Sequence, residues 1–195
     1  MDAIETLMSE HRAIERVLDG LVAFAEDTAR RGATEKEELA RFVTFVREFA
    51  DARHHGKEED ILFAAMVDAG FPRNGGPVAV MLHEHDQGRA LVRILKERAE
   101  QPAAWSDADR QEIADVARGY SAMLHAHIHK EDAVLYPMAE QHLSPEAMAR
   151  VGEACARYEA AREGSLDELH GLGEALVARH ALAAHPASQR PDVFG

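Results

Sequence analysis

The chain has 195 residues and a formal net charge of −13, with 35 acidic and 22 basic side chains. A surface this acidic repels phosphate groups, which argues against nucleic-acid binding and against docking on an anionic membrane. The single cysteine, Cys155, excludes an internal disulfide and a thiolate metal cluster. No stretch alternates apolar and polar residues as a strand would, and the charged N-terminus does not resemble a signal peptide. We therefore expect an all-α, cytoplasmic protein.

Glycine and proline divide the chain into helical segments. The first is expected over residues 3–30, with Gly32 as its C-terminal cap. The second is expected to start at Thr34, with Glu37 completing a capping box, and to end before residue 70. The third and fourth are expected over residues 77–100 and 107–142, the fourth capped by Ser106 or Asp107.

Ser144 and Pro145 mark the start of a C-terminal helical segment, which is expected to break near residue 164 and to continue to about residue 184. We interpret residues 1–142 as an up-down-up-down four-helix bundle and residues 143–184 as a helical extension packed on it. Residues 185–195 are expected to form a flexible tail. A role of the extension in partner binding or dimerisation stays open, because the sequence identifies neither a protein partner nor an oligomeric state.

Two histidine-rich blocks repeat one design. Residues 54–63 (HHGKEEDILF) and 127–136 (HIHKEDAVLY) both read His-x-x-Lys-Glu-acid-x-apolar-Leu-aromatic. Upstream of each block, residues 7–11 (LMSEH) and 81–85 (MLHEH) both read apolar-apolar-x-Glu-His. The chain therefore contains two helical hairpins of the same pattern.

The repeat predicts a metal centre. Residues four apart share one helix face, so each second helix can present a histidine and a glutamate to the same centre, and each first helix adds a histidine. The histidines chosen lie on apolar stripes, whereas His55 continues a polar row through Glu48 and Asp51. The predicted metal ligands are His11, His54, Glu58, His85, His127 and Glu131. Nitrogen and oxygen donors suit iron, manganese or zinc, and two carboxylates able to bridge favour two ions.

The other histidines are expected to face outward or to lie behind the ligands. The histidines expected on the outer face or behind the ligands are His55, His83, His125 and His129. Those expected to be solvated are His142, His170, His180 and His185. Replacement of chosen ligands by His55 with Glu59, or by Asp132, stays open. Glu10 and Glu84 are left without a role, because adjacent residues on a helix diverge by about 100°. Tyr120, seven residues before His127, is expected to lie nearer the centre than Tyr136, although its simplest role is in the core.

These blocks resemble the hemerythrin-like (HHE cation-binding) family over roughly residues 3–140. The resemblance implies a four-helix bundle that holds two iron ions with the six residues named above. One departure is Arg89, which stands where the oxygen carriers of the family have a fifth histidine. This version is similar to the branch of the family associated with redox, peroxide, nitric oxide or iron-responsive roles, and it argues against simple reversible oxygen carriage.

The function expected is that of a non-heme di-iron protein that reacts with or senses dioxygen, peroxide or nitric oxide. Whether it is an enzyme stays open: the alternative is a di-iron enzyme that disproportionates peroxide or oxidises ferrous iron. A third interpretation is a structural zinc ion that holds the bundle together. A proton donor positioned beside the centre would favour the enzyme.

Overall fold

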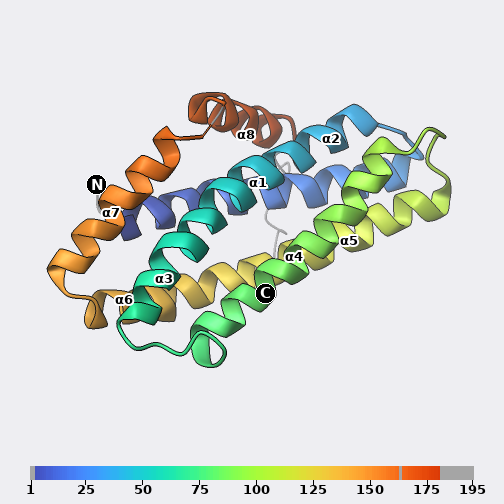
Figure 1. Ribbon diagram of the computed structural model, residues 1–195. Helices are drawn as coiled ribbons and strands as arrows, with labels where there is room; N and C mark the ends of the chain where they lie inside the picture. Colours follow the sequence, from blue (N-terminus) through green and yellow to red (C-terminus); the bar gives the residue numbers. More distant parts are fainter. Residues whose placement is uncertain (1–2, 163, 181–195) are drawn as a thin grey trace, which may run out of the picture.

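The computed structural model describes residues 3–162 and 164–180, which form helices and contain no strand (Figure 1). Four long helical segments make an up-down-up-down bundle, as the sequence predicted. The first segment is α1 (Ala3–Arg31), and the third is α4 (Gly76–Glu100). The second segment joins α2 (Lys36–Phe45), η1 (Val46–His55), η2 (Glu58–Leu62) and α3 (Phe63–Asp68). The fourth joins α5 (Asp107–Lys130), η3 (Glu131–Leu135) and α6 (Tyr136–His142).

The helix ends follow local chemistry. Gly32 adopts a positive φ of 66° directly after α1, a conformation that costs glycine little. The Ser106 hydroxyl accepts a hydrogen bond from the Asp109 amide at 3.2 Å, and the Asp109 carboxylate accepts one from the Ser106 amide at 2.8 Å. The capping box predicted at Thr34 is wrong, because the Thr34 hydroxyl instead accepts a hydrogen bond from the Trp105 amide across the neighbouring loop.

The apolar core forms two clusters, one on each side of a polar layer. The larger cluster includes Leu21, Phe42 and Ile113, and the smaller one includes Leu7 and Leu62, each of these at most 1% exposed. Burying one such side chain contributes roughly 1.5–3 kcal/mol. Each long segment passes from one cluster to the other, and its histidines lie at the crossing. The two clusters therefore enclose that layer on both sides along the bundle axis.

Three short stretches in the ligand-bearing segments are π-helical: η1, η2 and η3. A π-helix has one more residue per turn than an α-helix and occurs frequently at functional sites. Each added residue rotates the following side chains by roughly 100° relative to an unbroken α-helix. The faces occupied by residues near 54–62 and beyond 131 therefore differ from those that a 3.6-residue period predicts.

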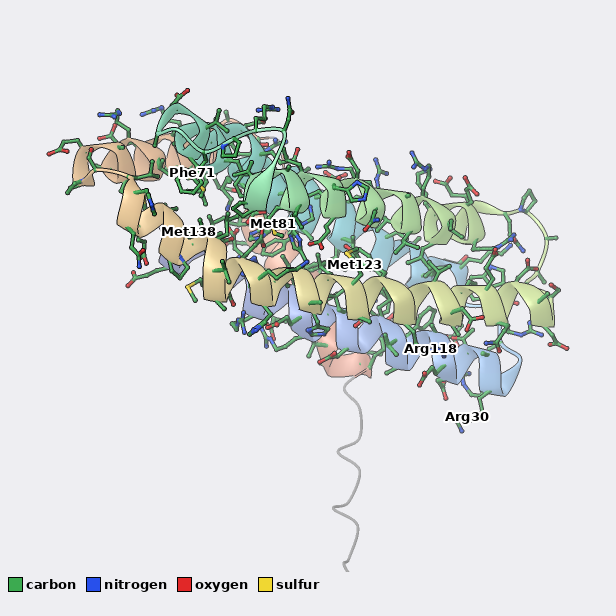
Figure 2. All side chains as sticks on the ribbon, turned by 90° about the horizontal axis from the view of Figure 1, so that it is seen from below. Arg30, Phe71, Met81, Arg118, Met123 and Met138 are labelled. Carbon is green, nitrogen blue, oxygen red and sulfur yellow. The ribbon has the colours of Figure 1, made fainter. Side chains whose placement is uncertain are left out.

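Two further helices pack on the bundle. α7 (Pro145–Ala160) contacts α1 and η2, and α8 (Leu166–His180) lies along α1 and α2 (Figure 1). A Cβ on Gly173 would lie 2.7 Å from the Phe45 ring, so the close approach of α8 needs glycine there. Side chains that mark opposite ends of the bundle are Phe71 and Arg30 (Figure 2). No helix in the described ranges is long and apolar enough to cross a membrane.

The expectation that His180 is solvated is wrong. Its side chain is 15% exposed, its ring packs against those of Phe24 and Phe42, and its Nε2 lies 2.7 Å from Glu38 Oε1. His142 and His170 are exposed, as predicted. His185, the predicted helix end near residue 184 and the tail over 185–195 lie outside the described residues.

Candidate metal centre

The four long segments bring all six predicted ligands into the polar layer between the apolar clusters. His11 comes from α1, His85 from α4 and His127 from α5, whereas His54 and Glu58 come from the second segment and Glu131 from the fourth. Each of the six is at most 1% exposed. His55, which the apolar pattern placed elsewhere, is 5% exposed and belongs to the same layer.

The donor atoms form two groups, and within each group they all lie within 4.8 Å of one another. One group contains His11, His54, Glu58 and Glu131. The other contains His55, Glu58, His85 and His127. Glu58 belongs to both groups, so its carboxylate is placed to bridge two ions.

The Glu131 spacings match those of two donors on one ion, and the Glu58 spacings are longer than ordinary hydrogen bonds. Glu131 Oε2 lies 3.3 Å from His11 Nε2 and 3.2 Å from His127 Nε2. Glu58 Oε2 lies 3.5 Å from His85 Nε2 and 3.7 Å from His54 Nε2. Hydrogen bonds of this type centre on about 2.9 Å. Two donors on one ion, with bonds of roughly 2.1 Å, stand about 3.0–3.4 Å apart at angles between 90° and tetrahedral.

A carboxylate oxygen lies beside the outer nitrogen, Nδ1, of each ligand histidine. The partners at 2.7–2.8 Å are Asp132 for His11, Glu10 for His54, Glu59 for His85 and Glu84 for His127. An ionised carboxylate only accepts hydrogen bonds, so we assign the ring proton to Nδ1. This tautomer directs the lone pair of each Nε2 into the centre, as a metal ligand requires.

Cationic side chains hold these carboxylates in turn. Lys57 pairs with Glu10, and Lys130 pairs with Glu84. Arg89 lies 2.6 Å from Glu59, which supports His85, and 2.8 Å from Asp51. The residue that replaces the fifth histidine of the oxygen carriers therefore orders the carboxylates behind the second group.

His85 and His127 present their Nε2 atoms to each other at 3.0 Å. With each Nδ1 proton given to a carboxylate, two lone pairs face one another unless a positive species, a proton or a metal ion, lies beside them. The carboxylates also require a positive species beside them. Within the described residues, Glu58 Oε2 and both Glu131 oxygens are buried without a hydrogen-bond partner. Buried polar atoms left in this state are costly. The donor set therefore fits bound cations.

The pKa values of the two glutamates are displaced in opposite directions. Burial and the neighbouring Glu131 carboxylate raise the pKa of Glu58 well above its usual range. Burial acts in the same direction on Glu131, but His11 and His127 outweigh it and hold the pKa of Glu131 well below its usual range. Because metal ligands must be deprotonated, a bound cation would favour the charged form of both carboxylates.

Tyr136, not Tyr120, is the tyrosine at the centre, so that expectation is wrong. The Tyr136 hydroxyl donates a hydrogen bond to Glu58 Oε1 at 2.6 Å and lies 3.4 Å from His11 Nε2. On a regular helix a residue nine after His127 would point away from it, but η3 intervenes and rotates Tyr136 inward. Tyr120 is buried in the larger apolar cluster, where it lines a cavity with His55 and His85.

Of the positions left open for His55, the polar outer face is wrong, because its side chain is buried. Its ring stacks on that of His85 with centroids 3.9 Å apart, and its Nδ1 lies 3.4 Å from Asp51 Oδ1. His55 ends the π-helix η1, so the 3.6-residue period used to place it does not apply. His83 and His129 are exposed and His125 is half-buried beside Asp19, consistent with positions outside the ligand groups.

Together the fold and the site define a metal-binding helical-bundle protein. The sequence matches the Hemerythrin HHE cation binding domain over residues 2–139, and the chain belongs to this family. It is 36% identical over 92 residues to the iron-sulfur cluster repair protein YtfE of Musicola paradisiaca, covering 45% of this chain and 40% of that protein. It is 26% identical over 138 residues to uncharacterized proteins of Mycobacterium bovis and Mycobacterium tuberculosis, covering 69% of this chain and 52% of theirs.

The chain thus spans about half the length, or less, of these curated relatives. No solved structure matches it.

Proposed function

We propose that this chain is a cytoplasmic, non-heme di-iron protein that reacts with or senses dioxygen, peroxide or nitric oxide. The observation that carries the proposal is the pair of four-residue donor groups that have Glu58 in common. Imidazole and carboxylate donors without a thiolate suit iron, with manganese and zinc as the competing ions. The name of the Musicola relative, an iron-sulfur cluster repair protein, supports a role in which iron is handled.

Iron, when bound, supplies electrons and exchangeable coordination positions. The side chains of this protein would hold the iron and orient its ligands. Glu10, Glu59, Glu84 and Asp132 fix the ring orientation of four histidines, and the apolar clusters on both sides limit access of water. Preorganised donors of this kind do not need to rearrange when ligands bind.

A di-iron enzyme that disproportionates peroxide or oxidises ferrous iron is the second candidate, and Tyr136 favours it. Its hydroxyl oxygen lies 2.6 Å from Glu58 Oε1 and donates a hydrogen bond to it, and Glu58 belongs to both donor groups. Burial and then the Glu58 charge raise the pKa of Tyr136 well above its usual range, so the hydroxyl stays protonated at neutral pH. Tyr136 is therefore placed as a hydrogen-bond donor beside the centre.

The test is metal analysis followed by spectroscopy. Protein produced with excess iron is expected to contain two iron ions per chain and to show ferric absorption that bleaches on reduction and returns in air. The matched controls are H54A, which should lose iron, and H83A, which should keep it because His83 is exposed. Colourless protein that retains only zinc would overturn the proposal. Added peroxide then separates the candidates: sustained oxygen evolution indicates an enzyme, and slow bleaching a binding or sensing protein.

A further inference from the structure

A cavity of about 240 Å³ lies between η1 and α4 and reaches the second donor group. Its inner wall includes His55, His85 and Tyr120, and the apolar side chains of Val46 and Val92 continue it outward. His55 and His85 belong to that donor group, so the cavity connects the metal centre with the surface of the bundle.

The outer part of this cavity is positively charged. Arg47 and Arg93 both line it and are exposed, and neither has an ion-pair partner within the described parts of the chain. The other charges compensate one another, because Arg89 pairs with Asp51 and Lys96 with Glu100. Two unpaired arginines thus flank an opening in a chain of net charge −13.

Such an arrangement selects by charge. A cavity lined by charges of one sign raises the local concentration of oppositely charged ligands and speeds their association by 10- to 1,000-fold. The net charge of the chain, −13, repels anions in general. Arg47 and Arg93 therefore make this opening the favoured approach for an anion.

The volume limits the size of the ligand. Each water molecule in the liquid takes roughly 30 Å³, so the cavity holds several waters or one small ion. Organic ligands usually occupy pockets of roughly 300–1,000 Å³. The cavity is thus suited to inorganic anions of a few atoms and not to nucleotides or peptides.

We propose that this cavity is the access route by which small inorganic anions reach the His55–His85 side of the centre, and that Arg47 and Arg93 favour anionic over neutral reactants. The inference rests on the proposed function, since the anion needs a metal ion at this group to bind. It adds a ligand class, small inorganic anions, to the dioxygen, peroxide and nitric oxide of that function, which are neutral molecules near pH 7.

The test uses azide as the probe and compares two double variants of the iron-loaded protein. R47E/R93E reverses the two charges at the cavity, and R73E/R150E makes the same change in net charge at exposed arginines that do not line it. At low ionic strength we expect azide to bind the ferric R47E/R93E protein at least tenfold more slowly than wild type, and the control to stay within twofold. High salt should shrink the difference. Nitric oxide, which is neutral, should bind the ferrous form of all three proteins at similar rates.

Equal azide rates in the two double variants at low ionic strength would overturn the charge selection. A cavity-filling variant, V92F, tests the route itself: it should slow both azide and nitric oxide, and unchanged rates for both would contradict the route. Failure of wild-type protein to hold iron would instead count against the proposed function, so the two failures are distinguishable.

Discussion

Glu10 on α1 accepts a hydrogen bond from Nδ1 of His54 at 2.8 Å, although the histidine next to it in the sequence is His11. Glu84 on α4 relates in the same way to His127, also at 2.8 Å. In each hairpin the glutamate of the first helix thus orients the histidine of the second. The pairs His11–Asp132 and His85–Glu59 instead join one hairpin to the other. Every polar residue of the duplicated pattern therefore has a place in the centre.

Removal of a supporting carboxylate should weaken metal binding without unfolding the bundle. We expect E10A and E84A each to lower the affinity for the metal by 10- to 100-fold, because the histidine behind it loses its fixed tautomer and orientation. Competition with a chromogenic chelator measures this. The control is E97A, at an exposed position on α4 away from the site. Equal affinities in all three variants would show that these carboxylates do not support the ligands.

His55 should bind the second metal ion. Because it belongs to a donor group with Glu58, His85 and His127, we expect H55A to keep one tightly bound iron and to lose most of the other. Metal content per chain after gel filtration measures this, with H129A as the control at an exposed histidine of the fourth segment. If H55A retains two ions, His55 is not a metal ligand and only supports the ligands.

The sequence predicted the helical bundle, its loops and six residues of the polar layer, because each of these depends on short-range sequence patterns. Helix ends follow glycine, proline and capping residues, and the internal repeat compares hairpins without any assumption about their geometry. His55 and Tyr136 were misplaced because their positions were counted at 3.6 residues per turn across η1 and η3. Nothing in the local composition marks these π-helical turns.

Contacts between helices that are distant in the sequence could not be predicted from the sequence either. Glu10 could not be assigned from the sequence, because the angle between neighbours on one helix, used correctly, only separates it from His11. Its partner is on another helix, and only the packing of α1 against the second segment brings His54 to it. The same holds for Glu38 and His180, which are 142 residues apart.

Tyr136 should contribute to the centre through its hydroxyl and not through its ring. We expect Y136F to fold, to lose about 1 kcal/mol of stability in the metal-free state and to alter the ferric absorption bands, since Glu58 loses a hydrogen bond. Thermal unfolding and absorption spectra measure the two effects. The control is Y158F, which removes a hydroxyl that donates to the Ala52 carbonyl and not to a donor residue. It should change stability alone, and identical spectra for Y136F and wild type would contradict the prediction.

The attachment of α8 should depend on pH through Glu38. Its carboxylate accepts hydrogen bonds from His180 at 2.7 Å and from Arg179 and Arg41 at 3.1 and 2.9 Å. Burial alone would raise the pKa of Glu38, but these partners outweigh it and lower the pKa below its ordinary value. A carboxylate with a lowered pKa contributes stability that is present above the unfolded-state pKa of about 4.3 and is lost as the pH falls below it.

Hydrogen exchange of the α8 amides should therefore quicken relative to those of α1 as the pH falls below about 4.3, and should change little between pH 7 and 5, after correction for intrinsic exchange rates. E38Q should loosen α8 by about tenfold at pH 7, the effect of losing roughly 1.4 kcal/mol of charged hydrogen bonding, and should flatten the pH dependence. E174Q is the control, because Glu174 also links α8 to α1 through Arg16 but both side chains are more than half exposed. An exposed pair contributes at most about 1 kcal/mol. If E174Q loosens α8 as much as E38Q does, or if E38Q keeps the wild-type pH dependence, the buried carboxylate is not what holds the helix.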